Sequence, residues 1–267
     1  MKLKGILTGI TMASMLAATS LWAEEVSTPT MSPADQKQVE KIVHNYLIKN
    51  PDVIFEAIQT LQQKQMTEAR KSVEKTQAVA PKFASALFHN AGDPSLGNAN
   101  GKIIIVDFFD YQCPHCVKMT PVLEAIVKAN PNVKVVFKEF PIRGPLSEYA
   151  SKVALAAKIQ GKYVEFHKAL MQLAMQQQLT EDSILKIAQV AGLDLSKVKT
   201  DIKSQAVEQQ IKNNTKLAQD LQLVGTPAFF VAMSDVTKSP TPSSIVFVPG
   251  QIDQEQLLAI IKKVSAK

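Results

Sequence analysis

Two cysteines separated by two residues are the groups in this sequence with the clearest capacity for covalent chemistry. Cys113 and Cys116 are the only cysteines among 267 residues, so a disulfide within the chain can form only between them. A purely structural bridge is the alternative, but closing so short a loop stabilises a fold by only about 2 kcal/mol. A redox role is favoured, because such a pair can exchange its disulfide with the thiols of another molecule.

The residues on either side of the pair predict a strand followed by a helix. Residues 103–109 are apolar except for Asp107, as in a buried strand. Residues 114–129 repeat apolar side chains with the period of an amphipathic helix. The cysteines would then lie where the helix begins. A helix N-terminus carries partial positive charge and unpaired N–H groups, and both favour a thiolate.

This placement gives each residue of the motif a different expected role. We expect Cys113 to be exposed and to be the attacking sulfur, and Cys116 to be the more buried, resolving sulfur. Pro114 fits the first helical position, where no N–H is required. His115 would add positive charge beside the thiolate. Asp107 is predicted to be buried, either to exchange protons with Cys116 or as a hydrogen-bonded structural acid.

The strand and the Cys-Pro-His-Cys motif together resemble the DsbA family of bacterial thiol oxidoreductases, which have a thioredoxin fold. Residues 138–147 are similar to the segment after the family's third strand, and residues 224–231 to its cis-proline loop. The resemblance covers roughly residues 83–264. It implies a cis peptide bond at Thr226-Pro227 facing the cysteines, where the backbone would bind an extended client segment. The alternative is a trans proline at a strand edge.

The predicted fold class is α/β: a thioredoxin-like fold with an inserted helical domain and an N-terminal helical oligomerisation region. The thioredoxin-like domain would comprise residues 81–145 and 224–267, and the insertion residues 146–223. Residues 91–101 are expected to be a loop, and Asp253 to start the last helix. The expected strands are residues 83–88, 103–109, 133–137, 228–231 and 245–248. The expected helices of the insertion are residues 149–159, 163–174, 181–191, 195–202 and 207–221.

Residues 24–80 form a separate N-terminal region in this interpretation. Start signals at Ser32 and Asn50 predict two helices with apolar stripes, followed by an exposed connecting helix at 62–80. Two short amphipathic helices cannot bury their apolar sides by themselves. They either dock on their own catalytic domain or pair with a second chain. A resemblance to DsbA-like proteins with N-terminal oligomerisation regions favours a homodimer and leaves dimer against trimer open.

Residues 1–23 have the features of a secretory signal peptide. Lys2 and Lys4 precede an apolar stretch that is too short to span a bilayer well. Cleavage is expected after Ala23, with Ser20 as the alternative position, and an uncleaved membrane anchor is the alternative interpretation. Export would place the protein in the periplasm, an oxidising compartment in which a cysteine pair can act on disulfides.

These features predict a protein thiol–disulfide oxidoreductase that forms or isomerises disulfides in exported proteins. The Cys-Pro-His-Cys motif points to oxidation, whereas Thr226 and the N-terminal region point to isomerisation, so the direction stays open. The resemblance implies cysteine-containing exported proteins as clients. It also implies a membrane redox partner, either a quinone-linked oxidase or a transmembrane thiol reductant. Loss of Lys2 and Lys4 with the signal peptide lowers the net charge from +6 to +4, and this mild charge with scattered lysines argues against a nucleic-acid partner.

Two other functions are compatible with the sequence. One is an oligomeric chaperone without redox activity, and the other is a Cu(I)-binding protein that uses the two thiolates. We expect neither a resident metal nor a cofactor other than the disulfide itself. The remaining histidines and the two methionines of the insertion receive no role: His44, His89 and His167 are expected at or near the surface, and Met171 and Met175 in the core.

Overall fold

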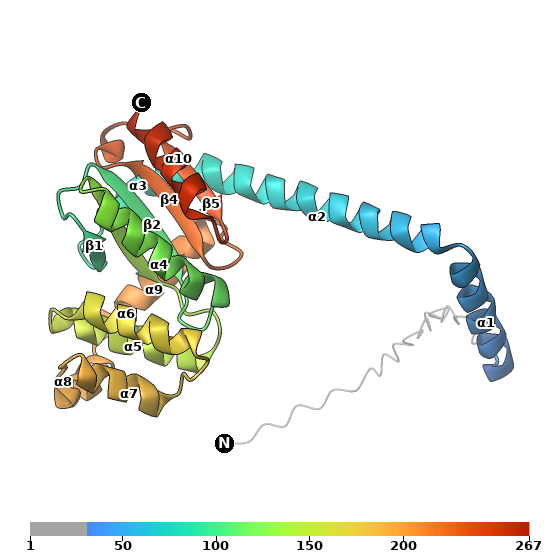
Figure 1. Cartoon of the computed structure of the whole chain (residues 1–267), viewed down its shortest axis with the longest axis horizontal. Helices are drawn as coiled ribbons and strands as arrows, with labels where there is room; N and C mark the ends of the chain where they lie inside the picture. The colour runs from blue at the N-terminus through green and yellow to red at the C-terminus, as the bar shows by residue number, and fades with distance from the viewer. Residues whose placement is uncertain (1–30, 267) are drawn as a thin grey trace, which may run out of the picture. The chain divides into compact units, whose positions relative to one another are not determined.

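The computed structural model describes residues 31–266, so the predicted signal peptide at residues 1–23 lies outside the described part of the chain (Figure 1). The chain separates into two units, Met1–Leu61 and Gln62–Lys267. Within residues 31–266, no helix combines the length and apolar character needed to cross a membrane.

The first unit contains α1 (Pro33–Lys49) and the beginning of α2 (Pro51–Val79). Ser32 caps α1 by accepting a hydrogen bond from the backbone N–H of Asp35, as its sequence predicts. No residue of α1 is buried. The exposed apolar side chains of these two helices recur at helical spacing: Val39, Ile42, Val43, Tyr46, Val53, Ile54, Ile58 and Leu61. The unit therefore presents an uncovered apolar stripe.

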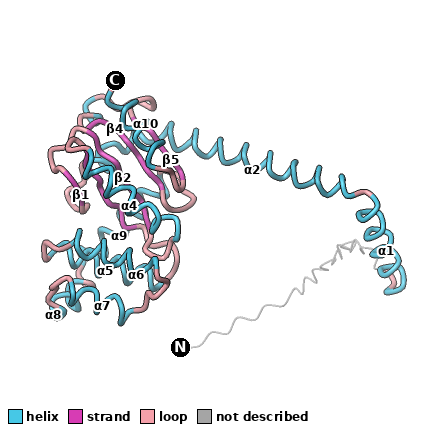
Figure 2. Tube along the Cα trace, in the orientation of Figure 1, coloured by secondary structure: helices cyan, strands magenta, loops and turns pink. Residues whose placement is uncertain are grey.

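The second unit is built on a five-stranded mixed sheet with the order β1-β3-β2-β4-β5 (Figure 2). The strands are β1 (Ser95–Gly97), β2 (Ile103–Phe109), β3 (Val133–Glu139), β4 (Ala228–Met233) and β5 (Ile245–Pro249). The β2 strand runs parallel to β3 and antiparallel to β4, and every residue of β2 is buried. Its sequence, apolar except for Asp107, follows from this central position, because helices cover both faces.

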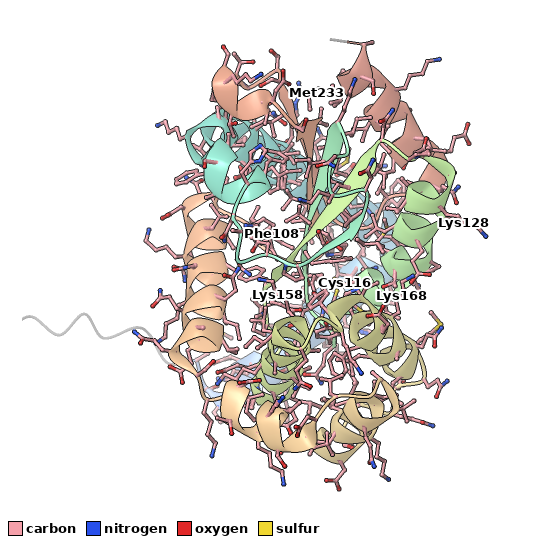
Figure 3. All side chains as sticks on the ribbon, turned by 90° about the vertical axis from the view of Figure 1, so that its left-hand side faces the viewer. Phe108, Cys116, Lys128, Lys158, Lys168 and Met233 are labelled. Atoms are coloured by element: carbon pink, nitrogen blue, oxygen red, sulfur yellow. The ribbon has the colours of Figure 1, made fainter. Side chains whose placement is uncertain are left out.

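Alternation along β2 divides the core into two layers. Ile105 and Phe109 pack with α4 (Pro114–Ala129) and α10 (Gln254–Ser265) on one face. Val106 and Phe108 pack on the other face with α3 (Ala84–Phe88) and with α9 (Gln205–Asp220). Figure 3 shows α4 and α9 on opposite sides of the sheet. Since Asp107 shares the parity of Ile105, it lies on the face that α4 covers.

The prediction of a strand at residues 83–88 was wrong. The chain there forms the short helix η1 (Ala80–Phe83) and then α3. The buried residues Ala84, Leu87 and Phe88 have the spacing of one helical face. Six residues are too few to distinguish this spacing from the alternation of a strand. The edge strand β1 instead lies inside the expected loop, where its three residues are too short to show alternation.

The insertion is helical, as predicted. It contains α5 (Pro145–Ile159), α6 (Tyr163–Met175), α7 (Glu181–Val190), α8 (Leu195–Asp201) and α9. Three of these helices begin at side-chain caps on Thr180, Asp194 and Ser204. The α5 helix packs against α6, α7, α8 and α9, and its buried alanines allow this close approach. Beyond the insertion, η2 (Val236–Lys238) lies between β4 and β5, and Asp253 caps α10.

The last turns of α2 belong to the second unit rather than to an exposed connector. The hydroxyl of Thr76 is buried and donates to the carbonyl of Leu221 at 2.9 Å. The side-chain amide of Gln77 donates to the carbonyl of Ile245 and accepts from the N–H of Phe247 at 2.9 Å. Gln77 thus pairs with the free edge of β5 as a neighbouring strand would. The predicted linker at residues 62–80 is therefore partly built into the second unit.

Candidate active site

The cysteine pair lies where β2 gives way to α4. Cys113 is the N-cap of α4, with extended backbone, and Pro114 occupies the first turn, as predicted. Asp110 fixes the intervening loop: its carbonyl accepts from the Cys113 N–H at 3.0 Å. Its carboxylate accepts from the backbone N–H groups of Ile142 and Arg143 at 2.8 and 3.0 Å. No pattern in the sequence marked Asp110 as part of the site.

Cys113 is fully buried, so the prediction that its sulfur is exposed was wrong. The reason is the loop before β4: Cys113 Sγ lies 3.3 Å from the carbonyl oxygen of Thr226, to which the sulfur donates only in its protonated form. A client would reach the sulfur by displacing this loop contact.

Hydrogen bonds stabilise the thiolate of Cys113. The thiol of Cys116 donates the most important one, followed by Thr226 and the backbone N–H groups of Cys116 and His115. Together they lower the pKa of Cys113 to about 5 against the opposing effect of burial. The Thr226 hydroxyl is buried without another hydrogen-bond partner, which leaves it free for this contact.

Cys116 has the opposite chemistry. Burial raises the pKa of its thiol far above the ordinary range, and the hydrogen bond to Cys113 and the charge of Asp107 act in the same direction. It therefore keeps its proton while Cys113 is ionised. Both cysteines are free thiols in this structure, which is thus the reduced form.

Asp107 is buried, as predicted, and its Oδ1 atom has no hydrogen-bond partner. Burial, and then the negative charges of Cys113 and Glu139, raise the pKa of this carboxyl well above its usual value. A protonated acid near Cys116 can donate a proton to that sulfur or recover one from it. The missing partner on Oδ1 argues against the purely structural alternative.

The imidazole of His115 is exposed and lies 3.0 Å from Gln251 Oε1, measured from Nδ1. His115 reaches the Cys113 sulfur through its backbone N–H. The electrostatic role that we expect for its ring stays a prediction. Gln251 follows β5, and nothing in the sequence pattern marked it as a neighbour of the active site.

The peptide bond Thr226-Pro227 is cis, as the resemblance implied. Val224, two residues earlier, is 89% exposed, although it is a large apolar side chain. Residues 223–228 and the end of β5 line a shallow hollow of about 220 Å³. An apolar hollow beside a reactive sulfur is suited to a client side chain.

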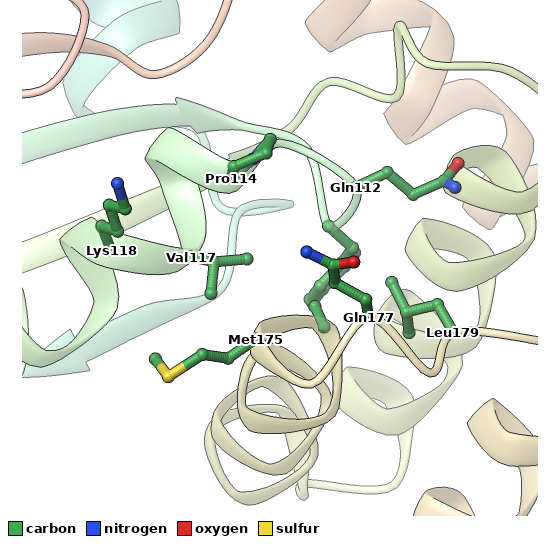
Figure 4. Close-up of a pocket in the computed structure, with 9 residues that line it drawn as sticks. Gln112, Pro114, Val117, Lys118, Met175, Gln177 and Leu179 are labelled. Atoms are coloured by element: carbon green, nitrogen blue, oxygen red, sulfur yellow. The ribbon is translucent and has the colours of Figure 1, made fainter.

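A larger groove of about 430 Å³ lies on another side of the motif (Figure 4). Pro114, Val117 and Lys118 of α4 form one wall. Met175 and Leu179, at the end of α6 and in the loop after it, form the other. Met175 is 58% exposed, so its predicted core position was wrong, whereas Met171 is buried as expected. The end of α6 leaves Met175 at the rim of the groove, where it can contact a bound segment.

A buried polar cluster beneath the site was missed. Glu139 Oε1 accepts from the hydroxyls of Tyr163 at 2.7 Å and Tyr111 at 3.2 Å. The Tyr111 hydroxyl also lies 3.0 Å from Nδ1 of His167. His167 is only 3% exposed, so its predicted surface position was wrong. It lies in the aromatic core between α6 and the sheet, and burial lowers its pKa to about 3.

The arrangement combines four properties in one place. Cys113 is a stabilised thiolate, Cys116 a retained thiol, Asp107 a buried acid with a raised pKa, and residues 226–227 an adjacent backbone surface. Such a set can form a mixed disulfide, resolve it and move the proton that the second sulfur requires.

Two protein-family models match separate parts of the chain. The model described as "DSBA-like thioredoxin domain" matches residues 104–262. The model described as "Copper resistance protein ScsC N-terminal domain" matches residues 35–68. The first match includes the cysteine pair and the cis-proline loop, and the second includes the whole exposed apolar stripe of α1 and α2.

Similar solved structures cover most of the chain. BcfH of Salmonella enterica Typhimurium is 32% identical, with a TM-score of 0.64, over 86% of this chain and 96% of that chain. ScsC of Proteus mirabilis in a transitional conformation is 28% identical, with a TM-score of 0.59, over 89% of this chain and 100% of that chain.

Similar curated proteins cover about half of the chain. The thiol:disulfide interchange protein DsbA of Bordetella pertussis is 29% identical over 150 residues, 53% of this chain and 69% of the relative. The Na(+)/H(+) antiporter NhaA 3 of Salinispora tropica is 27% identical over 137 residues, 51% of this chain. The chain spans only 21% of that antiporter, so this similarity concerns a part of the larger protein.

Proposed function

Because the chain belongs to the DsbA-like thioredoxin family, we propose that it forms and isomerises disulfide bonds in exported proteins through Cys113 and Cys116. The observation that carries the proposal is the contrast between the two sulfurs. Hydrogen bonding lowers the pKa of Cys113 to about 5, while burial keeps Cys116 protonated. A stabilised thiolate is a good leaving group, which favours transfer of the disulfide to a client.

In the oxidising direction, a client thiolate attacks Cys113 Sγ and the bond between Cys113 and Cys116 breaks. Cys116 leaves as a thiolate and takes a proton, which protonated Asp107 can supply because its carboxyl is buried close enough to influence this sulfur. A second client thiolate then attacks the client sulfur of the mixed disulfide, and Cys113 leaves as a stable thiolate. The client loses two electrons, the cysteine pair gains them, and one proton is released to solvent.

In the isomerising direction, the reduced protein attacks a wrong client disulfide with the Cys113 thiolate. The client sulfur that is expelled attacks elsewhere in the client, and a client thiolate finally releases Cys113. No net oxidation occurs, so this direction requires a reduced pair and a client that stays bound. The two hollows support such binding, because one is lined by Gln112 and Pro114 next to Cys113 and the other by Thr226 and Pro227, and both offer apolar contacts.

The exposed stripe of α1 and α2 is proposed to pair with the same stripe of another copy, giving a homodimer. Its apolar side chains are 38–59% exposed. A helix pair that stays in contact with water has no need of so many apolar side chains on one surface, so a partner is expected to cover them. The match of residues 35–68 to an N-terminal domain model supports a dedicated function for this region. Two sites in one assembly could hold a client while one of them attacks.

We place the protein in the periplasm, with cysteine-containing exported proteins as clients. A similar solved protein from Salmonella enterica serovar Typhimurium is described as periplasmic and thioredoxin-like. Continued turnover requires a membrane redox partner, because each oxidised client leaves the pair reduced. A quinone-linked oxidase would restore the disulfide, and a transmembrane thiol reductant would maintain the reduced form for isomerisation.

The test uses the pure protein with a reduced dithiol peptide and with a ribonuclease whose disulfides are scrambled. We expect oxidation of the first and reactivation of the second, and loss of both with Cys113→Ser. Cys116→Ser should instead accumulate mixed disulfides with clients, because the resolving sulfur is missing. Wild-type protein inactive in both assays would refute the function. If Cys113→Ser still suppressed client aggregation, holding would be a separate activity of the chain.

A further inference from the structure

Glu139 is a buried acid that the exchange reaction described above does not use. It ends β3, where it pairs in register with Phe109 of β2, and its side chain is fully buried. Asp107 pairs with Phe137 in the same two strands. Glu139 and Asp107 are therefore diagonal neighbours on the sheet face that α4 covers.

The carboxylate of Glu139 connects the active-site loop to the insertion. Its Oε1 atom accepts from Tyr111, which lies two residues before Cys113, and from Tyr163, the first residue of α6. Its backbone carbonyl accepts from the side-chain amide of Asn214 in α9 at 3.2 Å. One residue of β3 thus holds contacts to three other parts of the second unit.

The groups around Glu139 are acids, phenols and a neutral imidazole. Asp107 and Asp110 face it from β2 and the loop that follows. Tyr111 and Tyr163 donate to it, and His167 contacts Tyr111. Ser151 of α5 and Asn214 are its neutral neighbours. The adjacent cation, Lys138, points to the other face of the sheet and pairs with Asp93.

The electrostatic contact with Asp107 gives Glu139 a route to the thiols. Asp107 senses the charges of Cys113 and of Glu139, and Cys116 in turn senses the charge of Asp107. Burial raises the pKa of Glu139 to about 8, so it is neutral in mild acid and becomes charged in mild base. A new charge on Glu139 would make Asp107 hold its proton more tightly.

We propose that Glu139 is a positioning residue for thiol–disulfide exchange. It holds the loop that carries Cys113 against the helical insertion, and its ionisation controls whether Asp107 can accept the proton of Cys116. The inference rests on the proposed function and adds to it a second buried acid, which reaches the cysteines through Tyr111 and Asp107 and is itself tied to the insertion through Tyr163.

The test separates charge from shape. Glu139→Gln keeps an oxygen that can accept from both tyrosines and removes the charge. The carboxylic C=O stretching band of Asp107, assigned by its loss in Asp107→Asn, is followed by infrared spectroscopy of the reduced protein from about pH 6 to about pH 10. We expect Asp107 to ionise at lower pH in Glu139→Gln, by roughly half a unit or more. Glu165→Gln, which changes an exposed acid of α6, should leave the titration unchanged.

An Asp107 titration that is the same in wild type and Glu139→Gln overturns the proposal. If Glu139→Gln does not fold, Tyr163→Phe removes the shorter hydrogen bond to the carboxylate and should raise the pH at which the Glu139 band disappears. A Glu139 band unchanged in Tyr163→Phe would then overturn it. The infrared titration requires no client, so its failure is distinguishable from failure of the exchange assays.

Discussion

The sulfurs of Cys113 and Cys116 belong to one motif but have different surroundings. Cys113 caps a helix and receives hydrogen bonds from a thiol, a hydroxyl and two backbone N–H groups. Cys116 lies deeper, near an acid. The same short segment thus produces a thiolate and a thiol at neutral pH, and this difference makes Cys113 the attacking and leaving sulfur in both directions of the proposed exchange reaction.

The reduced protein should show a thiolate whose ultraviolet absorbance titrates with a midpoint near pH 5 and disappears in Cys113→Ser. Cys116→Ala should raise that midpoint, on the order of one unit, because it removes the most important hydrogen bond to the thiolate. A midpoint near that of an ordinary thiol, about 8.5, in the wild type would show that these hydrogen bonds do not form.

The same ionisation should make the stability of the reduced form depend on pH. A lowered thiol pKa stabilises the fold fully above the pKa of an unfolded thiol, and this contribution fades as the pH falls and is lost below about 5. The disulfide form has no such thiolate. Urea unfolding at about pH 8 and about pH 4 should therefore show the reduced form losing stability relative to the oxidised form in acid, by a few kcal/mol.

At the scale of secondary-structure elements, the end of α2 is fastened to β5 by one side chain. Gln77 gives β5 both a donor and an acceptor where the sheet would otherwise end. Gln77→Glu keeps the acceptor but loses the donor and sets a carboxylate against the carbonyl of Ile245. We expect a loss of about 1–3 kcal/mol in the free energy of unfolding, measured in urea. Gln65→Glu, at an exposed position of the same helix, is the matched control. Equal stability of both variants would show that the contact is dispensable.

Elements with long local patterns were predictable from the sequence, and those fixed by distant contacts were not. The β2 strand, α4 and the helices of the insertion followed from apolar periodicity and from caps such as Thr180 and Asp194. The α3 helix was mistaken for a strand because five residues are too few to show the repeat of apolar side chains that distinguishes a helix. Cys113 was expected at the surface because its cover comes from Thr226, more than a hundred residues later. Glu139 was missed because its tyrosine partners lie on two other elements.

At the scale of the molecule, the two units divide at Leu61, within a single helix. A chain that begins at residue 62 retains Thr76 and Gln77, and with them the contacts that anchor the helix end. We expect this chain to fold, to exchange with small dithiols, to be monomeric by light scattering, and to reactivate scrambled ribonuclease poorly.

A chain that begins at residue 81 is the informative comparison, because it lacks both anchoring residues. It should unfold at lower urea concentration than the chain that begins at residue 62. An oligomer formed by the chain that begins at residue 62 would place the self-association surface outside the stripe of α1 and α2.

The contact between Gln77 and β5 has a consequence for a protein whose clients arrive unfolded. Unfolded chains add readily to any open sheet edge and can aggregate there. One edge of this sheet is β1, only three residues long, and Gln77 occupies part of the other. Both edges of the sheet are therefore poor sites for backbone pairing with an unfolded client. The loop at Thr226-Pro227 remains available for such pairing, and a client bound there would have its cysteine beside Cys113.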